Sequence, residues 1–129
     1  NLTYLSLSKD VVSIGNYAFK GTAITELDTA NLINLEIIGN SSFANTSLTV
    51  INIPSSTKII DSYAFSNAEI NEIIFKNDSN LETIGDNAFD GCTSLSKVYI
   101  NEKNNRSNIN AIQIGDDVFN NCCSKAVIS

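Results

Sequence analysis

A six-residue motif that recurs five times along the chain is the feature that most limits how it can fold. Each copy begins with isoleucine, continues through small or polar residues and ends with phenylalanine. The copies lie at residues 14–19, 38–43, 60–65, 84–89 and 114–119. Their phenylalanines are 24, 22, 24 and 30 residues apart. A period in the twenties indicates a stack of small similar units, because each unit can bury its apolar side only against its neighbours.

A second pattern, with the spacing apolar-x-x-apolar-x-apolar, precedes or follows each motif. Its last two apolar residues are separated by one residue, as a half-buried strand requires. The copies are Leu2, Leu5 and Leu7; Ile24 and Leu27, with Thr29 at the third place; Leu48, Ile51 and Ile53; Ile70, Ile73 and Phe75; and Leu95, Val98 and Ile100. We therefore predict one β-rich solenoid over residues 1–129, with about five rungs whose strands form one parallel sheet.

The motif also predicts how the chain leaves this sheet. Glycine follows the isoleucine at Gly15, Gly39, Gly85 and Gly115, and Asp61 takes its place in the third copy. Both residue types tolerate positive φ, which predicts a tight corner. The spacing from there to phenylalanine suits one short helical or 3-10 turn that points the ring inward. The rings would then form a column of offset or edge-to-face contacts. Residues 11–13, 35–37 and 112–113 are candidates for a second short strand on the opposite side.

Charge and composition exclude several classes of partner. The net charge is −6 and the eight basic residues are scattered, whereas nucleic-acid binding requires clustered Lys and Arg. The same balance argues against anionic membranes, and no apolar run approaches the roughly 18 residues of a membrane span. Neither end carries the polar cap that a repeat stack needs. We therefore expect a piece of a longer array.

Residues that commonly carry catalysis or bind metals are sparse. The chain has no histidine, so its cysteines lack an imidazole base and a zinc site is not expected. The acids Asp86, Asp90, Asp116 and Asp117 lie near the corners but match no calcium-loop spacing, so we interpret them as solvated corner residues. We predict no enzyme activity, no metal site and no cofactor.

Two of the three cysteines occupy equivalent places in adjacent rungs, since Cys92 and Cys122 each follow a motif phenylalanine by three residues. Neighbouring strands lie about 4.8 Å apart, whereas a disulfide needs Cβ atoms about 3.8 Å apart. A strained bridge is therefore possible, but buried thiols are the favoured interpretation. Cys123 is expected to be exposed.

The segment 48–65 resembles the BspA-type leucine-rich repeat. It carries the apolar-x-x-apolar-x-Ile-Pro run that ends at Pro54, followed by the motif that ends at Phe65. The run Gly91-Cys92-Thr93-Ser94-Leu95 matches the Gly-Cys-x-x-Leu link of that repeat, which further favours a buried thiol at Cys92. The resemblance covers nearly the whole chain. Its departures are Asp61 for Gly, Ser42 and Val118 for Ala, and an insertion at 101–110.

This resemblance implies a right-handed solenoid on a cell-surface or secreted protein of a bacterium or protist. It also implies adhesion to host proteins or to other cells. The second implication is an analogy between folds, because function depends on the exposed side chains and not on the scaffold.

The outward positions of the strands form the candidate binding surface. Tyr4, Val50, Ile74 and Tyr99 place apolar or aromatic groups where water is expected, and tyrosine is enriched at protein interfaces. β-Branched and aromatic residues also stabilise strands without binding a partner, which is the alternative explanation for their presence here. The predicted protein-binding residues are Tyr4, Glu26, Asp28, Val50, Asn52, Glu72, Ile74, Lys97 and Tyr99.

Two functions remain open at this point. The leading hypothesis is a non-catalytic adhesion or recognition module that binds a host, matrix or other-cell surface protein through this face. The acids Glu26, Asp28 and Glu72 suit a partner with a basic patch. The alternative is a passive spacer or stalk that presents another domain.

Overall fold

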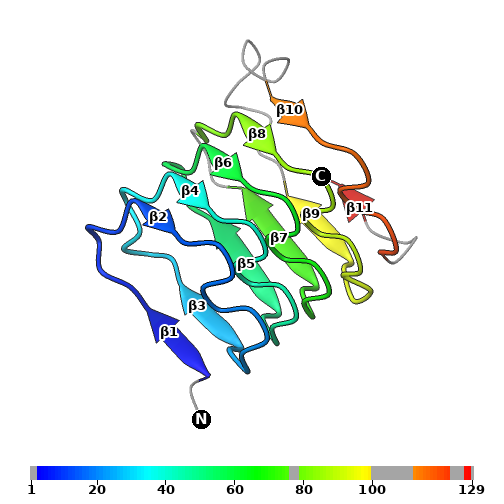
Figure 1. Ribbon diagram of the computed structural model, residues 1–129, viewed down its shortest axis with the longest axis horizontal. Coiled ribbons are helices and arrows are strands. Elements are labelled where there is room, and N and C mark those ends of the chain that lie inside the picture. The colour runs from blue at the N-terminus through cyan, green and yellow to red at the C-terminus, as the bar shows by residue number, and fades with distance from the viewer. Residues whose placement is uncertain (1–2, 76–78, 100–111, 123–126, 129) are drawn as a thin grey trace.

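The chain winds into a solenoid whose rungs place strands on two opposite sides (Figure 1). The computed structural model describes residues 3–75, 79–99, 112–122 and 127–128. The main face consists of β1 (Tyr4–Ser6), β3 (Glu26–Asp28), β5 (Val50–Ile53), β7 (Glu72–Phe75), β9 (Lys97–Tyr99) and β11 (Val127–Ile128). The second sheet consists of β2 (Ser13–Ile14), β4 (Ile37–Ile38), β6 (Ile59–Ile60), β8 (Thr83–Ile84) and β10 (Gln113–Ile114). The predicted repeat solenoid is confirmed.

Equivalent residues pair directly across neighbouring rungs, and the pairing is parallel throughout the described strands. The second sheet aligns Ile14, Ile38, Ile60, Ile84 and Ile114. On the main face Ile51 pairs with Ile73, and Ile73 pairs with Val98. Because side chains alternate along a strand, this register turns equivalent apolar residues to the same side. The candidate second strand is therefore also confirmed.

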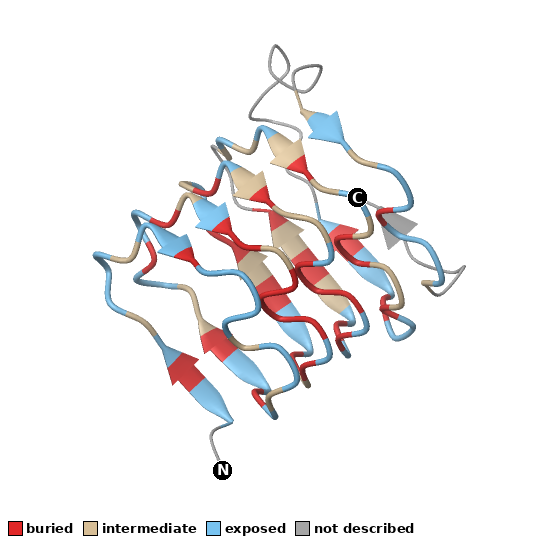
Figure 2. Cartoon of the chain, viewed as in Figure 1, coloured by how far each residue is buried: buried red, intermediate tan, exposed pale blue. Residues whose placement is uncertain are grey.

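The phenylalanines of the motif form an unbroken column inside the solenoid. Successive ring centroids lie 5.4, 5.5, 5.2 and 5.7 Å apart, from Phe19 to Phe119, and the ring planes differ by at most 15°. The rings are thus stacked in parallel, and none of these contacts is edge-to-face. Phe43, Phe65 and Phe89 are fully buried, whereas Phe119 is 38% exposed. Buried residues line the inside of both faces (Figure 2).

The chain turns from the second sheet toward the main face without a helix, so the prediction of a helical turn is wrong in the described rungs. Each turn instead holds two residues with positive φ, as at Tyr17 and Gly21. The N–H groups of Tyr17, Phe19 and Gly21 all donate to carbonyls of the next rung, each at 2.8 Å. A helix would direct these N–H groups to its own carbonyls. The turn therefore extends the bonding between rungs around the corner.

The glycine after each motif isoleucine was predicted to supply positive φ, and that prediction is wrong. Positive φ among the described glycines occurs at Gly21 and Gly91, which lie elsewhere in the turn. At Gly39, Gly85 and Gly115 the glycine is required by close packing against the preceding rung instead. A Cβ at Gly39 would lie 2.5 Å from the Ile14 carbonyl oxygen, and one at Gly85 would lie 2.5 Å from the Ser62 nitrogen.

The main face is not one sheet, contrary to the prediction. β1 pairs with β3, and β5, β7, β9 and β11 form a separate four-stranded sheet, whereas the second sheet runs unbroken from β2 to β10. We call the unpaired boundary between β3 and β5 the seam (Figure 1). Two local features lie at the carboxyl ends of the two unpaired strands. Asp28 Oδ1 accepts the Ala30 N–H at 3.0 Å and so turns the chain away after β3. Pro54, directly after β5, has no N–H to donate.

Candidate functional site

The nine predicted binding residues all lie on strands of the main face, at positions that alternate with core residues. Tyr4, Glu26, Val50, Lys97 and Tyr99 are exposed, and Asp28, Asn52, Glu72 and Ile74 are half-buried. The register brings Tyr4 beside Glu26, aligns Val50, Glu72 and Lys97, and aligns Asn52, Ile74 and Tyr99. The seam divides this surface, so the hydrogen-bonded register does not continue from β3 to β5.

The part of the surface on β1 and β3 is acidic and carries one aromatic ring. The Tyr4 hydroxyl donates to Asp28 Oδ2 at 3.0 Å, which links the two strands across their outer side. This hydrogen bond raises the pKa of Tyr4, since it stabilises the protonated phenol. Tyr4 is nevertheless 49% exposed, so its ring remains available to a partner. Glu26 stands beside it on β3.

The part of the surface on β5, β7 and β9 is more apolar. Ile74 lies between Asn52 and Tyr99, and Val50 lies beside Glu72 at the edge that borders the seam. Lys97 Nζ lies 5.7 Å from the centroid of the Tyr99 ring, a cation–π contact that holds the ring against its own strand. This part therefore offers an aliphatic and aromatic strip with charged groups along one side.

The prediction of buried thiols holds for Cys92, whereas Cys122 is only half-buried. Cys92 is a fully buried free thiol, so no disulfide joins it to Cys122. Its Sγ donates to the Phe65 carbonyl at 3.2 Å, and Cys122 Sγ donates to the Phe89 carbonyl at 3.1 Å. Burial raises the pKa of Cys92 to about 12. A thiol that remains protonated is a poor nucleophile. Cys123 lies outside the described residues.

Two of the four corner acids, Asp86 and Asp90, accept hydrogen bonds from the next rung. Asp86 Oδ1 accepts the Asp116 N–H at 2.8 Å, and the Asp90 carboxylate accepts from the side-chain amides of Asn87 and Asn121. Across residues 3–75, 79–99 and 112–122, no three Cys, Asp or Glu side chains cluster closely enough to hold a metal ion. The same described residues contain no helix that could cross a membrane.

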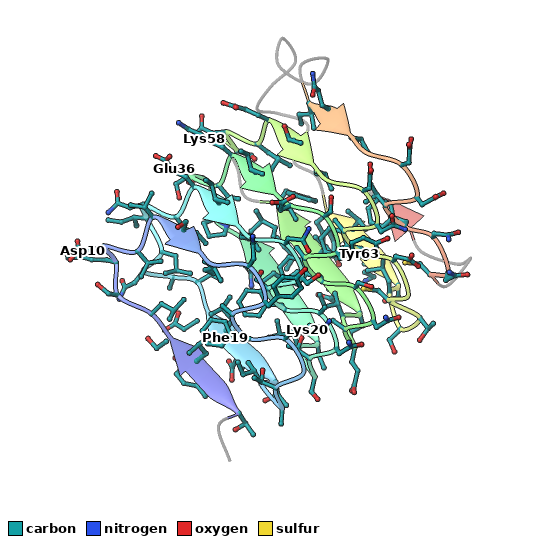
Figure 3. The ribbon with its side chains drawn as sticks, viewed as in Figure 1. Asp10, Phe19, Lys20, Glu36, Lys58 and Tyr63 are labelled. Carbon is teal, nitrogen blue, oxygen red and sulfur yellow. The ribbon has the colours of Figure 1, made fainter. Side chains whose placement is uncertain are left out.

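Two exposed tyrosines on the turns were not among the predicted site residues. Tyr17 and Tyr63 are 58% and 44% exposed, and both have positive φ. Figure 3 labels Tyr63 and Lys20, the residue that lies next to the Tyr17 ring. Lys20 Nζ lies 5.5 Å from the centroid of the Tyr17 ring. Equivalent positions hold Ser41, Asn87 and Asp117, also with positive φ. A tyrosine among short polar residues at one repeat position was the signal in the sequence that could have identified them.

The seam was missed as well, although the sequence holds two indications of it. Thr29 occupies the place of the last apolar residue in its strand pattern, and the chain's one proline follows the next strand. Thr29 and Pro54 directly follow β3 and β5, the two strands that fail to pair.

Comparison with known proteins supports the repeat assignment. Residues 1–125 match the family model described as BspA type leucine-rich repeat region, in six copies. The crystal structure of the pneumococcal vaccine antigen PcpA is similar in fold, with a TM-score of 0.77 and 22% sequence identity. The similarity covers 93% of this chain but 28% of that one. A search of curated proteins finds no significant match.

Proposed function

Because the chain belongs to the BspA-type leucine-rich repeat family, we propose that it is a non-catalytic module that binds a partner protein through the outer side of the main face. The observation that carries this proposal is the run of apolar and aromatic side chains that the structure leaves accessible there. Val50, Ile74 and Tyr99 come from three adjacent strands, which hold them in fixed relative positions. Rigid aromatic and aliphatic groups bind at low entropic cost, as protein interfaces commonly exploit.

The partner we propose is a host, matrix or other-cell surface protein, and the module then belongs to a cell-surface or secreted protein. Two observations support this. The family is one that the sequence itself resembles over nearly its whole length, and the similar solved structure is that of a vaccine antigen. The similar region makes up 28% of that antigen. The partner and the location are therefore proposed for this chain and are not transferred from the whole antigen.

Electrostatics favours a partner with a basic patch. The chain carries a net charge of −6, and Glu26, Asp28 and Glu72 all lie on the proposed face. Complementary charge increases the rate of association and excludes partners of like charge. Lys97 adds one positive charge beside Glu72 and limits the acidic zone on that side.

Replacing the four apolar side chains of the face tests the proposal. A variant with Tyr4→Ser, Val50→Ser, Ile74→Ser and Tyr99→Ser should no longer retain a partner from a panel of immobilised surface and matrix proteins, because the apolar contact area is lost. The circular dichroism spectrum should not change, since these side chains point away from the core.

A matched control removes four exposed apolar groups that lie off this face. Val12→Ser, Tyr17→Ser, Ile33→Ser and Tyr63→Ser alter side chains that are at least as accessible. The control should bind as the parent protein does. Full binding by the first variant would contradict the proposal.

The alternative is a passive spacer, which the regular bonding between rungs favours. The even ring spacing and the repeated backbone bonds make the stack stiff along its axis. A spacer predicts that the parent protein retains no partner from the same panel. The two functions are thus separated by the parent protein before any variant is made.

A further inference from the structure

The seam leaves two strand edges without their usual partners. Elsewhere on the main face, backbone bonds lead from each rung into the one before it: Thr25 N–H donates to the Thr3 carbonyl at 2.8 Å, Asn71 N–H to Thr49 at 2.7 Å, and Ser96 N–H to Asn71 at 2.9 Å. Within the described rungs, the corresponding bond from Thr49 N–H to the Thr25 carbonyl is missing, and β3 and β5 share no ladder.

The separation is local to the main face. On the other side of the same two rungs, β4 pairs with β6 through Ile37–Ile59 and Ile38–Ile60. In the turn, Phe43 N–H donates to the Ala64 carbonyl at 2.8 Å, and the Phe43 and Phe65 rings remain stacked. The rungs are therefore held together at the back while their front strands stand apart.

The β5 edge carries no charged side chain among its outward residues, although Pro54 follows the strand directly. Exposed edges are commonly blocked by charged side chains, above all lysine. The outward residues of β5 are Val50 and Asn52, and neither carries a charge. Its inward residues, Ile51 and Ile53, are fully buried, so the strand is firmly anchored. An unpaired, uncharged and anchored edge is suited to accept another strand.

From this geometry we propose that the seam binds an extended segment of the partner protein by β-strand addition, and that the segment carries basic side chains at alternate positions. The inference rests on the proposed function and specifies how the same face binds. Main-chain hydrogen bonds to β3 and β5 provide the affinity, while alternate side chains meet the outward groups of these strands. Glu26 and Asp28 on β3 select for lysine or arginine on the segment.

The first test needs no ligand. Amide exchange measured by NMR should be faster at Thr49 than at Thr25, Asn71 and Ser96 by about tenfold or more, the factor equivalent to about 1.4 kcal/mol and to one backbone hydrogen bond. A Thr49 amide that is protected as well as the other three would overturn the inference.

The second test adds a synthetic probe, the acetylated and amidated hexapeptide of three Lys-Val units. Binding should protect the Thr49 amide and leave the exchange at Asn71 and Ser96 unchanged. The same peptide N-methylated at alternate residues cannot pair through its backbone and should not bind. If the methylated peptide binds equally well, strand addition is wrong, although side-chain docking on the face is not affected.

A charge reversal identifies the edge that selects the segment. Glu26→Lys should weaken binding of the probe by roughly three- to tenfold, because it removes an attraction and adds a repulsion beside the seam. Glu82→Lys changes the net charge equally on an exposed residue next to the second sheet and should have little effect. Equal losses would show that only overall charge matters and would contradict a site at the seam. The fourfold serine variant tests the proposed function separately.

Discussion

At the scale of single residues, the residue type at several turn positions is restricted by contact with the preceding rung. The backbone conformation of the position itself does not require glycine there. Gly39, Gly85 and Gly115 each lie where a Cβ would overlap atoms of the preceding rung, whereas the same Cβ at Gly15 would meet nothing within 4 Å. The four glycines share one motif position. Their different surroundings show that the restriction comes from stacking.

This contrast predicts that Gly85→Ala destabilises the protein and Gly15→Ala does not. The Gly85 Cβ would lie 2.5 Å from the Ser62 nitrogen, so the rungs must shift, at a cost of about 1–3 kcal/mol. Gly15→Ala should be neutral or stabilise by about 0.5 kcal/mol. Urea denaturation of both variants measures the difference. Equal losses would mean that the turn itself, and not the contact between rungs, requires glycine.

The buried thiol of Cys92 makes stability depend on pH on the alkaline side. Its pKa is about 12 in the folded protein, against an ordinary value of 9.0, so below pH 9 the thiol is protonated in both folded and unfolded chains. As pH rises above 9, only the unfolded chain loses the proton. This group should then lower the free energy of unfolding by about 1.4 kcal/mol per pH unit.

The measurement is urea denaturation between pH 9 and 10.5, with Cys92→Ala as the reference. Other groups also titrate in that range, so the informative quantity is the difference in slope between the two proteins. Cys92→Ala should be less stable at pH 8 but lose stability less steeply above pH 9. Parallel slopes would show that the Cys92 thiol ionises as readily in the folded protein as in the unfolded one.

At the scale of structural elements, the phenylalanine column is the part of the core that every rung shares. An interior ring contacts a ring on each side, as Phe65 does with Phe43 and Phe89, whereas Phe119 contacts only Phe89 among the described rings. The gain from stacking and burial should therefore depend on a ring's place in the column.

Phe65→Ala should accordingly destabilise the protein by about 3–5 kcal/mol, as for other buried aromatics. Phe119→Ala should cost clearly less, because that ring is 38% exposed and is stacked on one side. Thermal and urea unfolding of both variants provide the comparison. Equal destabilisation would argue that the column is not a shared core.

The elements that could be predicted are those whose conformation follows from the sequence of a single repeat. The alternation of Ile51 and Ile53 with outward residues is sufficient to place a half-buried strand, and the repeat then places its neighbours. The turn was mispredicted because spacing alone cannot distinguish a helical turn from one whose N–H groups donate to the next rung, as those of Tyr17 and Phe19 do. The role of the glycines was missed for the same reason.

At the scale of the whole molecule, the candidate site was predicted only in part. The outward positions from Tyr4 to Tyr99 were assigned to the correct side because strand periodicity determines that side. Their division at the seam was not predicted, since it depends on how the rung that holds β3 packs against the rung that holds β5. The Asx turn at Asp28 follows one strand of that boundary, and Pro54 follows the other.

The turns, in which N–H groups donate directly to carbonyls of the following rung, have a consequence for how such a protein can change length. In the described rungs, the hydrogen bonds that a turn makes to other turns go to its immediate neighbours, as in a stack whose units contact only adjacent units. An in-frame duplication or deletion of one unit of about 24 residues therefore rejoins compatible partners. Binding chemistry at one place can diversify through mutation while the array around it grows or shrinks by recombination.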